Sequence, residues 1–207
     1  MTHRTAAAPT IFVVDDDSHM LAALQRLFRA SRFSVQAYAS AQEFLHRGDL
    51  ASSGLLLLDV MMPVMTGLEL QAALAERRVG LPIIFLTGAR SVPIAVEAMR
   101  RGAVDFLEKP FENAALVERV RHALHRATEK PAAGVNRDEY ERRRMLLTPR
   151  EREVMTQVVA GKTNKAIAQM LCVSHRTVEI HRTRVMEKMQ AASLAELVSA
   201  AFAYSGH

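Results

Sequence analysis

Five polar side chains that could do phosphate and metal chemistry stand directly after short apolar runs. They are three carboxylates, a hydroxyl and an ammonium: Asp15, Asp16, Asp59, Thr87 and Lys109. Clustered carboxylates repel one another, so such a cluster is costly unless a cation neutralises it. Mg²⁺ suits the cluster because it takes one or two carboxylates together with phosphate oxygens. Asp59 would then be a nucleophile toward a phosphoryl group, and Thr87 and Lys109 would hold the added oxygens.

Each of these residues also has an ordinary structural interpretation. Asp15 and Asp16 precede a helical pattern and would cap that helix, while Thr87 stands beside a glycine in a turn. Lys109 would be a solvated surface lysine. Any one of them alone favours the ordinary interpretation. The chemistry therefore depends on whether the fold brings all five side chains together.

The elements that must position these residues alternate between strand and helix. Residues 55–58 are four consecutive leucines, a run typical of a strand buried on both faces of a parallel sheet. Four more short runs predict strands at 11–14, 33–38, 82–86 and 105–108. Amphipathic helical patterns fill the intervals, so we expect an α/β fold with a five-stranded, parallel, doubly wound sheet of the flavodoxin-like kind. Parallel strands end at one edge, where the polar side chains would share a crevice.

A second, smaller domain is expected where this alternation stops. We predict a first domain over residues 1–126 and a linker over 127–147, in which the densely charged stretch 138–145 is a candidate helix. Residues 148–207 predict a small all-α domain. Its first three helices begin with residues of the N-cap type: Thr148, Asn164 and Ser174. The tight connection before the third helix indicates a helix-turn-helix.

Composition and charge limit the classes of function. The net charge of +5 is unevenly placed, because residues 1–130 hold 15 basic and 14 acidic residues whereas residues 131–207 hold 12 and 8. The excess suggests a polyanionic partner for the small domain, although a solvated basic surface is an equal alternative. No apolar run approaches the roughly 20 residues of a membrane span. The lone Cys172 excludes an internal disulfide. We expect a cytoplasmic protein with no membrane partner.

The third helix of the small domain has two different faces when its residues are projected about 100° apart. The inner face is apolar: Val178, Val185, Met186 and Met189. The outer face is mostly polar: Arg176, Ile180, Thr183, Arg184 and Glu187. Ile180 is the informative residue, because an aliphatic side chain on a DNA-reading helix can meet a thymine methyl group. Exposed isoleucines are also common without any function.

Residues 11–126 resemble the receiver domain of bacterial two-component systems. The resemblance rests on four blocks that occur in order at the predicted strand ends: VVDDD, LLLLDVMMPVMTG, IIFLTG and GAVDFLEKPF. It implies that Asp59 is the phosphoacceptor and that Mg²⁺ is the cofactor. By the same resemblance, the ligands of Mg²⁺ are Asp16 and Asp59 directly, Asp15 largely through water, and the backbone carbonyl of Met61.

The resemblance also implies a switch. Thr87 and Lys109 would contact the phosphoryl group, and Phe106 would swing inward together with the Thr87 hydroxyl. Without the resemblance, Phe106 is an ordinary core phenylalanine. Met61 and Ala89 flank the site and cannot position an attacking water, so we expect slow autodephosphorylation.

The stretch LTPREREVMTQVVAGKTNKAIAQMLCVSHRTVEIHRTRVMEKM resembles the LuxR-type helix-turn-helix domain. Together with the receiver, it makes the chain similar to response regulators of the NarL/FixJ family, and to the FixJ branch in particular. Residues 174–188 would then lie in the major groove of DNA. The base-facing positions would be Glu179, Ile180 and Thr183. The candidates for phosphate contacts are Lys165, Thr177, Arg182, Arg184 and Lys188.

The resemblance implies a phosphorylation-switched transcription factor. Its partners would be a sensor histidine kinase, double-stranded DNA and, once Asp59 is phosphorylated, a second copy of the chain, with RNA polymerase as a further candidate. Apart from its own phosphoryl transfer and dephosphorylation, it would not be an enzyme. A phosphatase of the haloacid dehalogenase type is an alternative, but it needs an aspartate where this chain has Met61. The remaining alternative is a receiver that acts as an adaptor between proteins without binding DNA.

Overall fold

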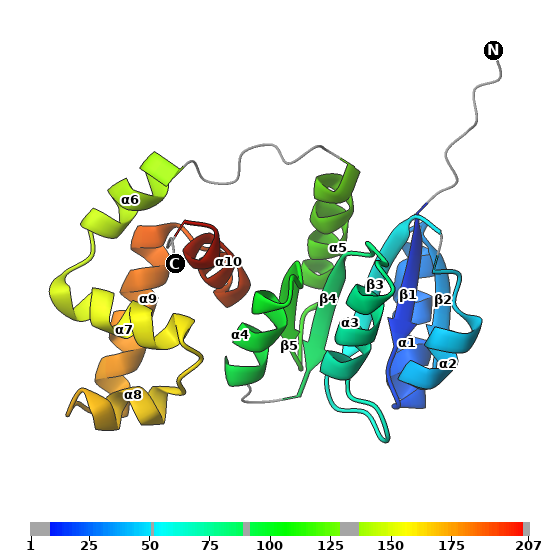
Figure 1. The fold of residues 1–207 in the computed structure, drawn as a ribbon, viewed down its shortest axis with the longest axis horizontal. Coiled ribbons are helices and arrows are strands. Elements are labelled where there is room, and N and C mark those ends of the chain that lie inside the picture. The colour runs from blue at the N-terminus through cyan, green and yellow to red at the C-terminus, as the bar shows by residue number, and fades with distance from the viewer. Residues whose placement is uncertain (1–8, 51, 89–91, 129–136, 205–207) are drawn as a thin grey trace, which may run out of the picture. The chain divides into compact units, whose positions relative to one another are not determined.

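The computed structural model describes residues 9–50, 52–88, 92–128 and 137–204, and the chain divides into two compact units (Figure 1). Strands and helices alternate over the first 128 residues. The elements are, in order, β1 (Thr10–Val14), α1 (Ser18–Ala30), β2 (Ser34–Tyr38), α2 (Ala41–Arg47), β3 (Gly54–Asp59), α3 (Gly67–Glu76), β4 (Ile83–Thr87), α4 (Val92–Arg100), β5 (Asp105–Glu108) and α5 (Asn113–Thr128). The predicted order of elements is therefore confirmed.

The strands form one parallel sheet in the order β2-β1-β3-β4-β5. Its register aligns the ends of the strands that carry the polar residues. Val14 of β1 lies opposite Leu58 of β3, so Asp15 and Asp59 follow at the same level. Thr87 of β4 lies opposite Glu108 of β5, so Lys109 comes one residue beyond. The sheet thus brings these residues to one edge, as its parallel strands predict.

Helices cover both faces of the sheet, because side chains alternate along each strand. One set of alternate residues, which includes Ile11 and Leu57, packs with α1 and α5 in a single buried cluster. The other set faces α2 and α3. The ring of Phe12 packs at a tilt against Phe44 of α2 with the ring centroids 5.6 Å apart. Helix α3 begins at Gly67, where a Cβ atom would collide with the Asp59 carbonyl oxygen. The doubly wound α/β fold is therefore confirmed.

The C-terminal part is a bundle of short helices. Its elements are α6 (Arg137–Met145), α7 (Pro149–Val159), α8 (Asn164–Met170), α9 (His175–Met189) and α10 (Leu194–Tyr204). Thr148 caps α7 in a capping box with Glu151, and Ser174 caps α9. The cap of α8 is Thr163 rather than the expected Asn164, because the Thr163 hydroxyl accepts the Ala166 amide and Asn164 is already the first helical residue.

Helix α6 lies inside the stretch that was assigned to a linker. Tyr140 of α6 is 1% exposed and belongs to the same buried cluster as Val154, Ile167 and Val178. Its ring lies 5.5 Å from the ring of Tyr204 in α10. The candidate helix over 138–145 therefore forms, and it contributes to the core of the helical bundle rather than only connecting two domains.

Candidate functional site

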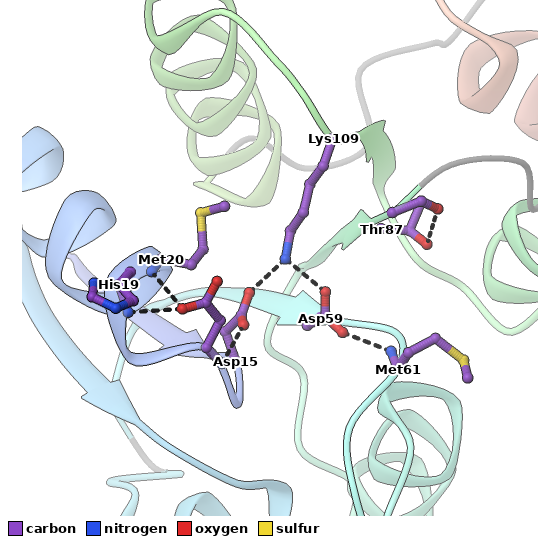
Figure 2. Close-up of polar contacts among 9 residues, drawn as sticks. Asp15, His19, Met20, Asp59, Met61, Thr87 and Lys109 are labelled. Carbon is purple, nitrogen blue, oxygen red and sulfur yellow. Dashed lines mark hydrogen bonds and ion pairs between the residues drawn. The ribbon is translucent and has the colours of Figure 1, made fainter.

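The crevice at the carboxyl edge of the sheet is organised around one ammonium group (Figure 2). Lys109 Nζ donates to Asp15 Oδ2 at 2.7 Å and to Asp59 Oδ1 at 2.8 Å. The second oxygen of Asp59 accepts the Met61 amide at 2.7 Å. Asp15 and Asp59 are almost fully buried, at 1% and 6% exposure. Both carboxylates are therefore fixed in direction before any ligand binds.

The other predicted site residues differ in burial and in hydrogen bonding. Thr87 is buried at the end of β4, and its hydroxyl donates to the Gly88 carbonyl at 3.1 Å rather than to Asp59. Asp16 is exposed beside Asp15, and the Met61 side chain is 67% exposed. Phe106 is half-buried in β5. Ala89, which was expected to flank the site, lies outside the described residues.

Burial dominates the electrostatics of Asp59. It raises the pKa of Asp59 above its usual range, although the hydrogen bond from Lys109 opposes the change. Burial alone would lower the pKa of Lys109, but its hydrogen bonds to Asp15 and Asp59 outweigh that effect and raise it. Lys109 thus stays charged and neutralises only one of two adjacent carboxylates. The pocket keeps an excess of negative charge that a cation would relieve.

The donor atoms fit a hard divalent cation such as Mg²⁺. Within the described part of the chain, no three histidine, cysteine or acidic side chains gather closely enough to hold a metal by themselves. Mg²⁺ does not need such a cage, because it keeps several waters and uses one or two carboxylates with phosphate oxygens. Asp59 and its acidic neighbours supply those carboxylates beside an exposed loop.

Helix α9 carries the second candidate site. Its inner residues Val178, Val185 and Met189 are buried, as the projection predicts. Its outer face forms a shallow hollow lined by Arg176, Glu179, Ile180, Thr183, Arg184 and Glu187. Ile180 is 42% exposed within this polar lining. The face thus offers an acceptor, donors and one apolar side chain to whatever it contacts.

The five candidates for phosphate contacts differ in how free their side chains are. Lys165 and Arg184 are exposed. The Thr177 hydroxyl lies 2.7 Å from the Ser174 hydroxyl at the helix cap. Arg182 donates to Asn164 Oδ1 at 2.7 Å, which ties α9 to α8. Lys188 donates to Glu151 Oε2 at 2.7 Å, which ties α9 to α7.

Two features of this unit were missed from the sequence. Glu151, three residues after Thr148, is placed as in a capping box, but it is also 2% exposed and its carboxylate holds Lys188. Arg176 was placed on the outer face but not among the DNA contacts, and it forms an ion pair with Glu179 at 3.4 Å. The three-residue spacing of Arg176 and Glu179 was a signal for the second feature. No local sequence pattern indicates the pairing of Glu151 with Lys188, because the two residues are 37 positions apart.

Two family models match successive parts of this chain. Residues 11–121 match the response regulator receiver domain, and residues 145–201 match the luxR family of bacterial regulatory proteins. The transcriptional regulatory protein FixJ of Rhizobium meliloti is 40% identical over 194 residues, which cover 94% of this chain and 95% of FixJ. The chain is a response regulator of the NarL/FixJ family.

Further relatives agree with that assignment. The tetrathionate response regulatory protein TtrR of Salmonella typhimurium is 42% identical to this response regulator, with 91% of this chain and 90% of TtrR covered. The solved structure of full-length FixJ from B. japonicum superimposes with a TM-score of 0.56 at 41% identity and covers 97% of this chain and 98% of that chain. The chain is thus a two-component transcriptional regulator with a receiver and a LuxR-type DNA-binding domain.

The family also defines the site in coarse terms. Receiver domains generally bind Mg²⁺ at the acidic pocket, which here is the region of Asp15 and Asp59. A receiver joined to a LuxR-type domain implies a histidine kinase and DNA as partners.

Among the helices that the structure describes, none combines the length and apolar character that a membrane crossing requires.

Proposed function

We propose that phosphoryl transfer to Asp59 from a sensor histidine kinase switches this response regulator to a form that dimerises and binds specific DNA. The observation that carries the proposal is the Lys109 ammonium, held between Asp15 and Asp59 at the carboxyl edge of the sheet. A carboxylate that is oriented, buried and adjacent to a fixed cation is prepared to act as a nucleophile toward phosphorus. The helix-turn-helix in the same chain would let phosphorylation of Asp59 change DNA binding.

The residues of the pocket have separate roles in the transfer. A new bond forms between an Asp59 carboxylate oxygen and phosphorus as the bond between phosphorus and the histidine nitrogen of the kinase breaks. Lys109 then moves its hydrogen bond from Asp59 Oδ1 to a phosphoryl oxygen. Asp16, Asp59 and the Met61 carbonyl would hold Mg²⁺, with Asp15 acting largely through water, and the bound ion would supply charge that screens the carboxylates and the phosphoryl oxygens.

Thr87 and Phe106 form the proposed switch. The Thr87 hydroxyl now donates to Gly88, and rotation about its first side-chain torsion would redirect it to a phosphoryl oxygen. That rotation vacates space for the half-buried ring of Phe106 to move inward. Phosphorylation thereby favours one of two receiver states. We expect that state to expose a dimer surface within residues 90–106, of which 90 and 91 lie outside the described residues.

Dimerisation would match the symmetry of a palindromic operator. The sequence of α10, LAELVSAAFAY, holds more apolar residues than one buried stripe needs, and we propose that two copies of the DNA-binding unit associate through this helix. RNA polymerase is a further partner at the promoter. Since DNA and a sensor kinase's cytoplasmic domain are its partners, we place the protein in the cytoplasm.

The phosphorylated form should be long-lived without other proteins. The exposed Met61 side chain has no group that could orient an attacking water, and the same holds for alanine at position 89. An unaided half-life of seconds, measured by loss of the phosphoryl group, would contradict this part of the proposal.

The experiment compares DNA binding before and after treatment with beryllofluoride and Mg²⁺, which together mimic the aspartyl phosphate. We expect salt-dependent DNA binding that strengthens on treatment, with dimerisation measured in parallel by sedimentation. Asp59→Asn should abolish both responses. Asp17→Asn is the matched control, because it removes a nearby charge while asparagine still caps α1, where Asp17 now accepts two backbone amides. Absence of DNA affinity in both states would favour the adaptor function instead.

A further inference from the structure

An arginine and a glutamate stand side by side on the outer face of α9. Arg176 Nη1 lies 3.4 Å from Glu179 Oε2, and His175 Nδ1 lies 3.4 Å from the other carboxylate oxygen. Arg176 and Glu179 line the same hollow as Ile180. Both are in the first two turns of α9, and it is the N-terminal residues of a recognition helix that contact base edges.

The two side chains have opposite and exclusive hydrogen-bonding abilities. An ionised carboxylate only accepts, whereas a guanidinium only donates, through a planar fork that matches two acceptors. Glu179 lies on the helix face that would enter the groove and would be repelled by phosphates. In this structure the exposed Arg176 side chain lies toward Glu179, so its guanidinium is on the same face as the carboxylate.

One base pair satisfies both side chains at once. In the major groove, cytosine presents a donor, N4, and its guanine partner presents two acceptors, O6 and N7. Glu179 would accept from cytosine while the fork of Arg176 donates to guanine. An A·T pair fits less well, because adenine places a donor beside one acceptor and thymine offers a single acceptor next to its methyl group.

We propose that Arg176 is a specificity-determining residue that, together with Glu179, reads a C·G pair in the operator. Glu179 accepts from cytosine N4 and Arg176 donates to guanine O6 and N7 of the same pair. The Thr183 hydroxyl donates to the Glu179 carbonyl at 3.1 Å, so its proton is not directed outward in this structure. This inference rests on the proposed DNA-binding function.

The test begins with DNA selected from a random pool by the full chain in the presence of beryllofluoride and Mg²⁺. The selected site should hold an invariant C·G pair in each half. Replacing its guanine with 7-deazaguanine removes one acceptor, and replacing its cytosine with N4-methylcytosine blocks the donor that faces the groove. Each replacement should weaken binding by roughly 5-fold to 150-fold, the range of a good base contact.

Variants assign the contacts to residues. Arg176→Ala should weaken binding to the selected site and make binding insensitive to 7-deazaguanine. Glu179→Ala, which removes the acceptor altogether, should weaken binding and make it insensitive to N4-methylcytosine. Arg176→Lys keeps the charge without the fork and should recover only part of the affinity. Arg184→Ala is the contrast variant: it removes an exposed arginine from the same helix and should weaken all sequences by about one factor, with a shallower salt dependence.

Two results would overturn the inference while leaving the proposed function intact. The first is that Arg176→Ala weakens the selected site and a site lacking the C·G pair by the same factor, as a phosphate contact would. The second is that neither base replacement changes binding. Absence of DNA binding with and without beryllofluoride would instead overturn the proposed function, and this inference with it.

Discussion

Lys188 has two possible roles in this protein, and removing its ammonium group separates them. As a residue of the DNA-reading helix it was expected to contact a phosphate, but it donates to Glu151 at 2.7 Å. Glu151 is 2% exposed, and its same carboxylate oxygen accepts the Thr148 amide at 2.8 Å. The perturbation is Lys188→Met, which keeps the length and apolar character of the side chain. Glu151 would then be a buried charge held by the cap of α7 alone.

The expected loss of unfolding free energy in Lys188→Met follows from the burial of Glu151. Removing one partner of a buried ion pair costs about 3–5 kcal/mol, because the other charge is left without compensation. The Lys188 side chain is 34% exposed, so water can reach the space it leaves. We therefore expect a smaller loss, about 2 kcal/mol. Glu151→Gln should cost less, about 1 kcal/mol, because glutamine still serves the capping box and Lys188 can turn to water.

The pH dependence of the unfolding free energy is a separate test of the Lys188–Glu151 ion pair. The hydrogen bond from Lys188 lowers the pKa of Glu151, with the Thr148 amide contributing in the same direction. The stability that this pairing adds is therefore present above the ordinary glutamate pKa and is lost as pH falls through the lowered value. In Lys188→Met the main cause of the lowering is gone. The stability deficit of the variant should thus shrink as pH is lowered from about 7 to about 3.

The assay is denaturant unfolding of the full chain. The chain has three tyrosines and no tryptophan, and Tyr140 and Tyr204 lie in the helical unit, so tyrosine fluorescence reports mainly on that unit. The double variant Lys188→Met/Glu151→Gln should lose less unfolding free energy than the two single variants together, and the difference is the coupling energy of the ion pair. The control Lys165→Met removes an exposed lysine and should leave stability unchanged while reducing the salt slope of DNA binding by about one ion. If Lys188→Met instead leaves stability intact and reduces that slope, Lys188 contacts DNA and the bracing role is refuted.

Three further predictions address the pocket, its loop and α6. Asp59→Asn should remove most of the stabilisation by Mg²⁺, which for the wild-type receiver reaches about 2.7 kcal/mol at an Mg²⁺ concentration of about 100 times the Kd. Thermal unfolding with and without Mg²⁺ measures this stabilisation. Equal Mg²⁺ stabilisation of both proteins would contradict the proposed metal site. Val64 is 94% exposed at a φ of 67°, so Val64→Gly should stabilise the receiver by up to about 1 kcal/mol. Val64→Ala retains a Cβ atom and is its control, and a destabilised Val64→Gly receiver would refute the argument from strain. Tyr140→Ala should cost the helical unit about 3 kcal/mol, whereas near-zero loss of unfolding free energy would mean that α6 is only a linker.

The sequence alone determined the pocket because its signals are local. Apolar runs and the residues that end them fix where strands stop, and parallel strands stop at one edge whatever the details of packing. Asp59, Thr87 and Lys109 were therefore predictable as neighbours, and four sequence blocks in order identified the family. The capping box of Thr148 and Glu151 was equally predictable, because its two residues are three apart and make their own hydrogen bonds.

Contacts between residues far apart in the sequence could be identified only in the folded protein. The densely charged stretch of α6 gave no sign that Tyr140 would be buried, because its ring is covered by residues such as Tyr204, far along the chain. A helical projection places Lys188 outside the apolar face, but in the folded protein its ammonium pairs with Glu151, which is 37 residues away in the sequence. A helical projection ranks the faces of one helix, but it does not contain the neighbouring helices. The physical reason is that burial and ion pairing depend on which elements pack together, and that is settled by long-range contacts rather than by local periodicity.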